Sequence, residues 1–170
     1  IVSNGAVYPN INKTPKVKKL KKKLRRMQRQ VSRKYEMNKV GDKFVKTKNI
    51  SKIETKIKKQ YIKLTNVRND HRQKVTTEIV KTKPSRIVVE DLNVKGMMKN
   101  KHLAKAISEQ NFYAFTETLR YKCEAQGIEF VKASRWFPSS KTCSGCGNIK
   151  KDLKLKDRVY NCDCCGKSID

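Results

Sequence analysis

The sequence lacks the long apolar runs that membrane proteins carry. No stretch of about 18 consecutive apolar residues occurs, so no membrane-spanning helix is predicted. Near Ile1 there is no apolar core followed by a small-residue cleavage site, so no signal peptide is predicted either. The sequence shows no internal repeat. These features predict a soluble, cytoplasmic protein.

Acidic residues are also scarce. The 170 residues include 15 Asp and Glu against 42 Lys and Arg, which gives a formal net charge of +27. The excess is concentrated in residues 1–85, which hold 26 basic and 5 acidic residues, whereas residues 86–170 hold 16 and 10. A field of this size favours a polyanion, because neutralising phosphates releases condensed counterions. An anionic membrane surface is the competing partner.

Two helices are predicted within residues 14–83, joined by a loop at Gly41. The first has apolar residues three or four positions apart, at Val17, Leu20, Leu24, Met27, Val31 and Tyr35. The second continues this pattern at Ile50, Ile53, Ile57, Tyr61, Leu64, Val67, His71, Val75 and Ile79. Two long helices with a short connection are expected to pack antiparallel, with His71 in the core. Their lysine-rich exterior is interpreted as an arm for nucleic-acid backbone, with an ordinary solvated surface as the alternative.

The remaining periodicity predicts an α/β unit. Residues 1–8 resemble a β-hairpin around Ser-Asn-Gly, and the apolar run of residues 85–92 predicts a buried central strand. Residues 108–126 have helical spacing, followed by Gly127 at the position expected after a helix end. Residues 128–136 predict a second strand. The order strand, helix, strand favours parallel pairing.

Five of the six cysteines lie close together near the C-terminus. Four of them form two C-x2-C pairs: Cys143, Cys146, Cys162 and Cys165. This spacing can place four thiolates tetrahedrally about 2.3 Å from a zinc ion, and a site with four cysteines is closed and structural. Iron is the main competing metal. Residues 153–160 predict a small hairpin between the pairs, Cys164 is spare, and Cys123 is expected to be a buried small hydrophobe.

Two acids follow the predicted central strand. Glu90 is expected at its C-terminal end, where open α/β sheets place their ligands. Together with other carboxylates it would suit Mg²⁺, which prefers oxygen ligands, and a loop-capping role is the alternative. Asp91 would point to the opposite face and is interpreted as a cap or loop acid.

Several blocks of the sequence resemble the TnpB-like (OrfB) family of transposon-encoded proteins. Residues 87–97, Ile-Val-Val-Glu-Asp-Leu-Asn-Val-Lys-Gly-Met, are similar to the second conserved block of that family. Residues 136–147 resemble its Pro-Ser-Ser-x-x-Cys-x-x-Cys-Gly signature, and residues 160–166 supply the second cysteine pair. Asn66-x-Arg68-x-Asp70 also matches, although Gln73-Lys74 replaces the usual His-Lys pair.

The resemblance implies a partial ribonuclease-H-like (RuvC-type) core over residues 1–13 and 84–138. A basic helical hairpin at 14–83 would interrupt this core, and a zinc ribbon would occupy 139–170. In the family, a guide RNA selects the DNA, and three acids hold two Mg²⁺ ions that drive phosphodiester hydrolysis. Glu90 matches the catalytic Glu, and the two cysteine pairs match the zinc ligands.

The other two catalytic acids are not expected within this chain. The first catalytic acid belongs to a strand that would precede Ile1. Asp170 aligns with a family position that lies two residues before the last catalytic acid. We therefore expect a fragment of an RNA-guided DNA endonuclease that retains DNA and RNA binding, does not cleave DNA at a useful rate, and is marginally stable or associates. The alternative is a non-enzymatic zinc-ribbon remnant of a transposon. A ribosomal or transcription-associated ribbon protein would not account for the acidic strand end.

Overall fold

The computed structural model describes residues 2, 5–150, 152–153, 157 and 159–169. The chain forms two compact units. The first combines Ile1–Ile87 with Val94–Phe130, and the second combines Val88–Asn93 with Val131–Asp170. Within the described part of the chain, no helix is both long and apolar enough to cross a membrane.

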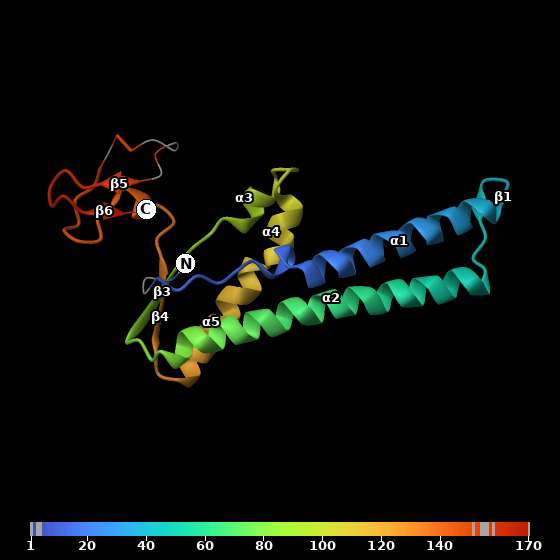
Figure 1. Cartoon of the computed structure of the whole chain (residues 1–170), viewed down its shortest axis with the longest axis horizontal. Coiled ribbons are helices and arrows are strands. Elements are labelled where there is room, and N and C mark those ends of the chain that lie inside the picture. Colours follow the sequence, from blue (N-terminus) through green and yellow to red (C-terminus); the bar gives the residue numbers. More distant parts are fainter. Residues whose placement is uncertain (1, 3–4, 151, 154–156, 158, 170) are drawn as a thin grey trace. The chain divides into compact units, whose positions relative to one another are not determined.

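Two long helices dominate the first unit, as the periodicity predicts. A 3-10 turn, η1 (Ile11–Lys13), leads into α1 (Pro15–Met37), whose first turn is capped by Thr14 through a 3.4 Å bond from the Val17 amide. Thr47 caps α2 (Lys48–Lys81) in the same way. Figure 1 shows α1 and α2 lying side by side along the hairpin.

The two helices pack antiparallel. Gln28 of α1 donates to the Tyr61 hydroxyl at 2.8 Å, and further along Tyr35 donates to Glu54 at 2.7 Å. Along the interface, the residue numbers of the contacting positions therefore decrease on α2 as they increase on α1. One buried apolar cluster between the helices consists of Val17, Leu24 and Leu64, with Ile11, Leu20, Ile57 and Val67 packed around them. The prediction of an antiparallel hairpin is confirmed.

The prediction for His71 is wrong. Its side chain is only half-buried and lines an open groove together with Lys16 of α1 and with Asp70 and other residues of α2. The apolar stripe drifts around a helix of this length, so a position on the extrapolated stripe need not face the partner helix.

The turn between α1 and α2 contains a short β-hairpin. Strand β1 (Lys39–Val40) pairs antiparallel with β2 (Lys43–Phe44), with Lys39 opposite Phe44. Gly41 has a φ of +58°, a conformation that glycine adopts without the steric cost that other residues meet. The Phe44 ring meets the Tyr35 ring edge-on at 6.1 Å between centroids. We call residues 38–46 the hairpin tip.

Three shorter helices complete the first unit: α3 (Val94–Met98), α4 (Ala104–Gln110) and α5 (Phe112–Ala125). The prediction of one helix over residues 108–126 is therefore wrong at its start. Asn111 interrupts it with a left-handed φ of 50°, and its side chain accepts a bond from the Ala114 amide. Asparagine is among the few non-glycine residues that tolerate this conformation. Gly127, with a φ of +66°, follows the helix end as predicted, and Cys123 is buried as predicted.

Polar contacts attach α4 and α5 to the hairpin. Glu109 of α4 lies 2.5 Å from the Lys21 ammonium and 3.2 Å from the Arg68 guanidinium. On α5, Lys122 donates to the Gln73 carbonyl at 2.9 Å and to the Thr76 and Thr77 hydroxyls at 2.8 and 2.7 Å.

Strands β3 (Arg86–Glu90) and β4 (Glu129–Ala133) form a two-stranded sheet. The side-chain pairs Arg86–Glu129 and Asp91–Arg135 join positions 43 and 44 residues apart. The difference in residue number between the paired positions is therefore nearly the same at both ends of the sheet. Strands that run in the same direction have this property, so the pairing is parallel, as predicted. The prediction of a buried central strand is wrong, because the Val88 side chain is 58% exposed. Among the described residues, β3 pairs only with β4, so its other edge has no partner strand.

The predicted hairpin of residues 1–8 falls partly outside the described residues. The described ones, Val2 and Gly5–Tyr8, form no strand. Two backbone hydrogen bonds link them: the Val2 amide donates to the Ala6 carbonyl at 2.9 Å, and the Gly5 amide donates to the Val2 carbonyl at 2.8 Å. The sequence has only two short apolar pieces here, and these are too short to maintain a ladder.

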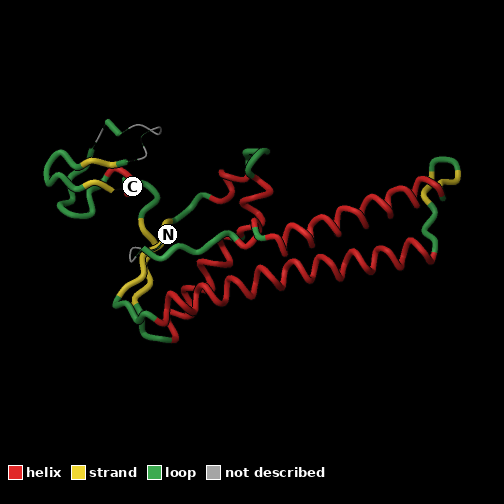
Figure 2. Tube along the Cα trace, viewed as in Figure 1, coloured by secondary structure: helices red, strands yellow, loops and turns green. Residues whose placement is uncertain are grey.

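The second unit has little regular structure, as Figure 2 shows by its short strands and long loops. It contains a 3-10 turn, η2 (Ser139–Lys141), and the antiparallel pair β5 (Tyr160–Asn161) and β6 (Ser168–Ile169). An isolated antiparallel bridge joins Thr142 to Ile149. Much of the hairpin predicted over residues 153–160 lies outside the described residues.

Candidate functional site

The first cysteine pair lies in a tight turn. The Cys143 amide donates to the Asn148 carbonyl at 2.8 Å, and the Gly147 amide donates back to the Cys143 carbonyl at 2.9 Å. The Gly145 amide approaches the Cys143 sulfur at 3.4 Å. Gly147 has a φ of +75°, which lets the chain reverse directly after Cys146.

The second pair repeats this arrangement. The Cys162 amide donates to the Lys167 carbonyl at 2.9 Å, and the Gly166 amide donates to the Cys162 carbonyl at 3.0 Å. Gly166 has a φ of +69° directly after Cys165. The two turns are therefore built alike, and each presents two sulfur atoms from a short loop.

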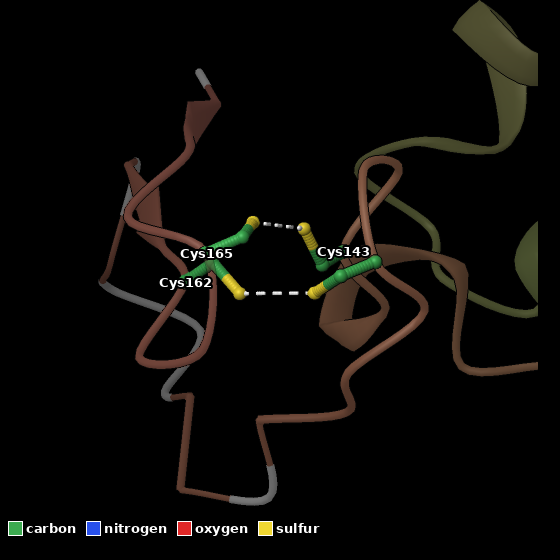
Figure 3. A group of neighbouring side chains, drawn as sticks. Cys143, Cys162 and Cys165 are labelled. Carbon is green, nitrogen blue, oxygen red and sulfur yellow. Dashed lines mark hydrogen bonds between the residues drawn. The ribbon is translucent and has the colours of Figure 1, made fainter.

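The two turns bring all four sulfur atoms together. They lie within 4.8 Å of one another, with 3.6 Å between Cys143 and Cys165 and 3.5 Å between Cys146 and Cys162 (Figure 3). A disulfide bond would require about 2.05 Å, so these are separate thiols. Within the described part of the chain, this is the only group of three or more His, Cys, Asp or Glu residues placed to hold a metal ion.

The electrostatics of the cluster favour a cation. The backbone amide of Cys165, assisted by that of Cys164, lowers the pKa of the Cys162 thiol to about 6. The Asn148 amide lowers the pKa of Cys146, but the adjacent Cys162 thiol and partial desolvation by the surrounding sulfurs outweigh it and raise that pKa to about 12. Ionising one sulfur thus opposes ionising its neighbour. A bound cation removes this conflict because it stabilises all the thiolates together.

The spacing of the sulfurs fits a tetrahedral metal site. Bonds of about 2.3 Å from zinc to sulfur place neighbouring sulfurs about 3.8 Å apart in a regular tetrahedron. The closest pairs, at 3.5 and 3.6 Å, are near this value. Two of the four cysteines, Cys143 and Cys162, are buried beside Tyr160, whereas Cys146 and Cys165 are exposed. Cys164 is exposed and lies outside the group.

The predicted Mg²⁺ ligand lies elsewhere in the second unit. Glu90 is the last residue of β3 and its side chain is exposed. Asp91 follows it and accepts a 2.7 Å bond from the Arg135 guanidinium, as expected of a loop acid. Among the described residues, no cluster of carboxylates forms around Glu90.

The exterior of α1 is almost uniformly basic. Its sequence, PKVKKLKKKLRRMQRQVSRKYEM, contains a single acid, Glu36. Of its basic side chains, Lys21 is paired with Glu109. Like charges recur at four-residue spacing, for example at Lys22, Arg26 and at Arg29, Arg33, and such pairs repel across one helical turn.

Sequence reasoning missed the Glu109 contacts. Arg68 belongs to the Asn66-x-Arg68-x-Asp70 motif, but its partners Glu109 and Asn12 lie far from it in the sequence. Only the three-dimensional arrangement brings these residues together.

The chain thus combines a basic helical hairpin, a mixed α/β arrangement and a cluster of four cysteines. The family model OrfB_IS605, described as "Probable transposase", matches residues 2–101, and the model for the Cas12f1-like TNB domain matches residues 112–170. The chain belongs to the TnpB-like (OrfB) transposase family.

Curated relatives agree with this assignment. A protein of Streptomyces pristinaespiralis named "Putative RNA-guided DNA endonuclease" is 38% identical over 116 residues, covering 68% of this chain and 29% of that protein. InsQ of Escherichia coli, which carries the same description, is 29% identical over 176 residues, covering 95% and 40%. TnpB-like protein L79 of Acanthamoeba polyphaga mimivirus is 31% identical over 130 residues, covering 73% and 24%. The matches thus span 24% to 40% of these relatives.

Proposed function

We propose that this chain is the nucleic-acid-binding part of an RNA-guided DNA endonuclease. The observation that carries the proposal is the α1–α2 hairpin, whose exterior presents a long series of lysines and arginines with few acids. Such a surface suits phosphates, which any nucleic acid supplies regardless of sequence. The names of the curated relatives point to guide RNA and DNA as the partners.

The four-cysteine centre is proposed to hold a structural zinc ion. Cys143, Cys146, Cys162 and Cys165 would occupy all four positions, leaving none for a reacting water. The metal would cross-link two loops that also meet through hydrogen bonds, such as those from the Tyr160 hydroxyl to the Asn148 carbonyl at 3.1 Å and from Lys167 to Ser144 at 3.2 Å. The second unit has a small apolar cluster, so much of its stability would come from the metal.

Glu90 is proposed as one carboxylate of a Mg²⁺ site in a RuvC-type core. Its place at the end of β3 and the resemblance of residues 87–97 support this role. The resemblance puts the other two acids beyond this chain. Bound Mg²⁺ would activate water and stabilise the leaving oxygen during phosphodiester hydrolysis.

Binding is tested with the full 170-residue chain, loaded with zinc, by fluorescence anisotropy of labelled 20-base-pair duplexes of DNA and of RNA. We expect saturable binding of both duplexes at about 0.1 M salt, with a dissociation constant of about 1 µM or tighter. If neither duplex binds at protein concentrations about a hundredfold above this dissociation constant, the proposal is contradicted.

The metal is tested by elemental mass spectrometry of purified protein. We expect one zinc ion per chain, and a variant Cys162→Ser that retains markedly less zinc. Cys164→Ser is the matched control, because Cys164 lies outside the four-sulfur group, and it should retain zinc fully. Stoichiometric iron in place of zinc contradicts the assignment.

The role of Glu90 is tested in the complete endonuclease with its guide RNA. Glu90→Gln should reduce DNA cleavage at least a hundredfold while leaving nucleic-acid binding intact. Asp91→Asn is the neighbouring control and should retain most activity, because Asp91 pairs with the Arg135 guanidinium at 2.7 Å. Equal losses in the two variants would contradict a specific role for Glu90.

A further inference from the structure

One face of α1 forms a cationic groove that ends at an apolar surface. Arg26, Arg29, Gln30, Arg33, Lys34 and Met37 line an open groove of about 460 Å³ on this helix. Three of these side chains are guanidinium groups on consecutive turns, separated by three or four residues. Guanidinium groups bind phosphate oxygens through paired, charge-assisted hydrogen bonds.

The end of the groove has a different chemistry. Met37, the last residue of α1, lines the groove and is 83% exposed. The hairpin tip follows it and exposes more apolar side chains: Val40 at 70%, Phe44 at 54% and Val45 at 44%. Exposed apolar residues gathered at one end of so polar a helix pair mark an interaction site.

The charge around the tip selects among possible partners. Lys39, Lys43 and Lys46 belong to the same turn, and the Lys39 ammonium lies 5.6 Å from the centre of the Phe44 ring. Two acids lie close by in sequence, Asp42 in the turn itself and Glu36 before Met37, so the three lysines leave the tip with a small positive excess. Glu54 of α2 is already bound by Lys46 and Tyr35. A second copy of this chain would bring the same positive charges into contact and be repelled. A polyanion with apolar faces fits both the lysines and the exposed apolar side chains.

We propose that the groove and the hairpin tip together bind a junction between paired and unpaired nucleotides, a surface assignment that rests on the proposed nucleic-acid function. Phosphates of the paired segment lie on Arg26, Arg29 and Arg33. The first unpaired bases, whose faces are no longer covered by neighbours, contact Met37, Val40 and Phe44. Aromatic and apolar side chains bind such bases without sequence preference.

The test uses the full zinc-loaded chain and two labelled probes of equal length, a blunt duplex and a duplex with a five-nucleotide overhang. Each probe is made in DNA and in RNA, so that the affinities for the two nucleic acids are compared directly. The wild-type chain should bind the overhang probe about fivefold more tightly than the blunt probe. Equal affinity for the two probes overturns the inference while leaving the proposed nucleic-acid function intact.

Two double variants separate the two parts of the surface. Arg29→Gln with Arg33→Gln should weaken binding of both probes at least tenfold, because two phosphate contacts are lost. Lys99→Gln with Lys101→Gln removes the same charge from exposed positions between α3 and α4 and should change affinity less than threefold. If both charge variants weaken binding equally, the groove is not the phosphate track, and the inference is wrong.

The second double variant, Met37→Gln with Val40→Gln, should remove the preference for the overhang and leave affinity for the blunt duplex unchanged. Its control, Met98→Gln with Val7→Gln, changes the same residue types at positions that are 44% and 66% exposed. The control should keep the preference. All four side chains are exposed, so the far-ultraviolet circular dichroism of each variant should match the wild type. A preference that survives the tip variant overturns the assignment.

Discussion

Replacing Leu64 by alanine should destabilise the helical hairpin strongly. Leu64 is 4% exposed and packs against Val17 and Leu24 across the α1–α2 interface. The substitution removes about three carbon groups from water-excluded surroundings, which at about 0.8 kcal/mol each gives about 2.4 kcal/mol. The remaining cavity raises the expected loss to about 3–5 kcal/mol, because long helices collapse around it only partly.

The matched control is Ile62→Ala on the same helix. Ile62 is 58% exposed, so the same truncation there should cost less than about 1 kcal/mol. Both variants are compared with the wild type by urea unfolding, followed through helix circular dichroism at 222 nm. The zinc content of both should be unchanged, because the four cysteines belong to the second unit.

The result that refutes this reasoning is a difference of less than about 1 kcal/mol between the two variants. It would mean that the α1–α2 interface is not a packed core in solution. The two long helices would then be held by something other than the apolar stripe.

Further predictions concern the polar contacts of the first unit. Lys122→Met should destabilise the docking of α5 on α2 by about 1–3 kcal/mol in urea unfolding, because three hydrogen bonds to a charged donor are lost; an unchanged midpoint contradicts this. The hydrogen bonds from Lys46 and then Tyr35 lower the pKa of Glu54. Its stabilisation of the hairpin tip is therefore fully present above the unfolded pKa of about 4.3 and is lost as pH falls from there through the lower folded pKa. Hydrogen exchange at the tip amides, corrected for intrinsic rates, should therefore accelerate below about pH 4 in the wild type but not in Glu54→Gln. Repulsion along α1 predicts that raising salt from about 0.05 to 0.5 M increases the thermal midpoint of the hairpin by a few degrees; a midpoint that falls would show that attractive pairs dominate.

The helical hairpin and the cysteine cluster were predictable because each depends on local spacing. The apolar residues from Val17 to Tyr35 repeat at three or four positions, and one helix of 23 residues covers them. The two C-x2-C pairs likewise fix two similar turns, because each has a glycine directly after its second cysteine. In both cases, the information lies within a few residues of the structure it determines.

The errors arose where a residue's surroundings depend on distant parts of the chain. The apolar run at Ile87–Val89 indicated a strand correctly, yet its burial depends on which strands flank it, and Val88 is exposed. Asn111 divides the predicted helix because its own backbone conformation overrides a continuous apolar stripe. The domain boundaries, the Mg²⁺ role of Glu90 and the RuvC-type core stay predictions.

The most direct test of the central claim, that a basic hairpin binds nucleic-acid backbone, is the salt dependence of duplex DNA binding by the zinc-loaded chain. Plotted as log K against log salt concentration between about 0.05 and 0.3 M, the slope should be steeper than about −3, which corresponds to three or more neutralised phosphates. The Arg29→Gln, Arg33→Gln variant should be shallower by about 1.8, since each lost phosphate contact removes about 0.9. Binding that does not change with salt would contradict the account, because no contact made mainly through lysine and arginine can be indifferent to counterions.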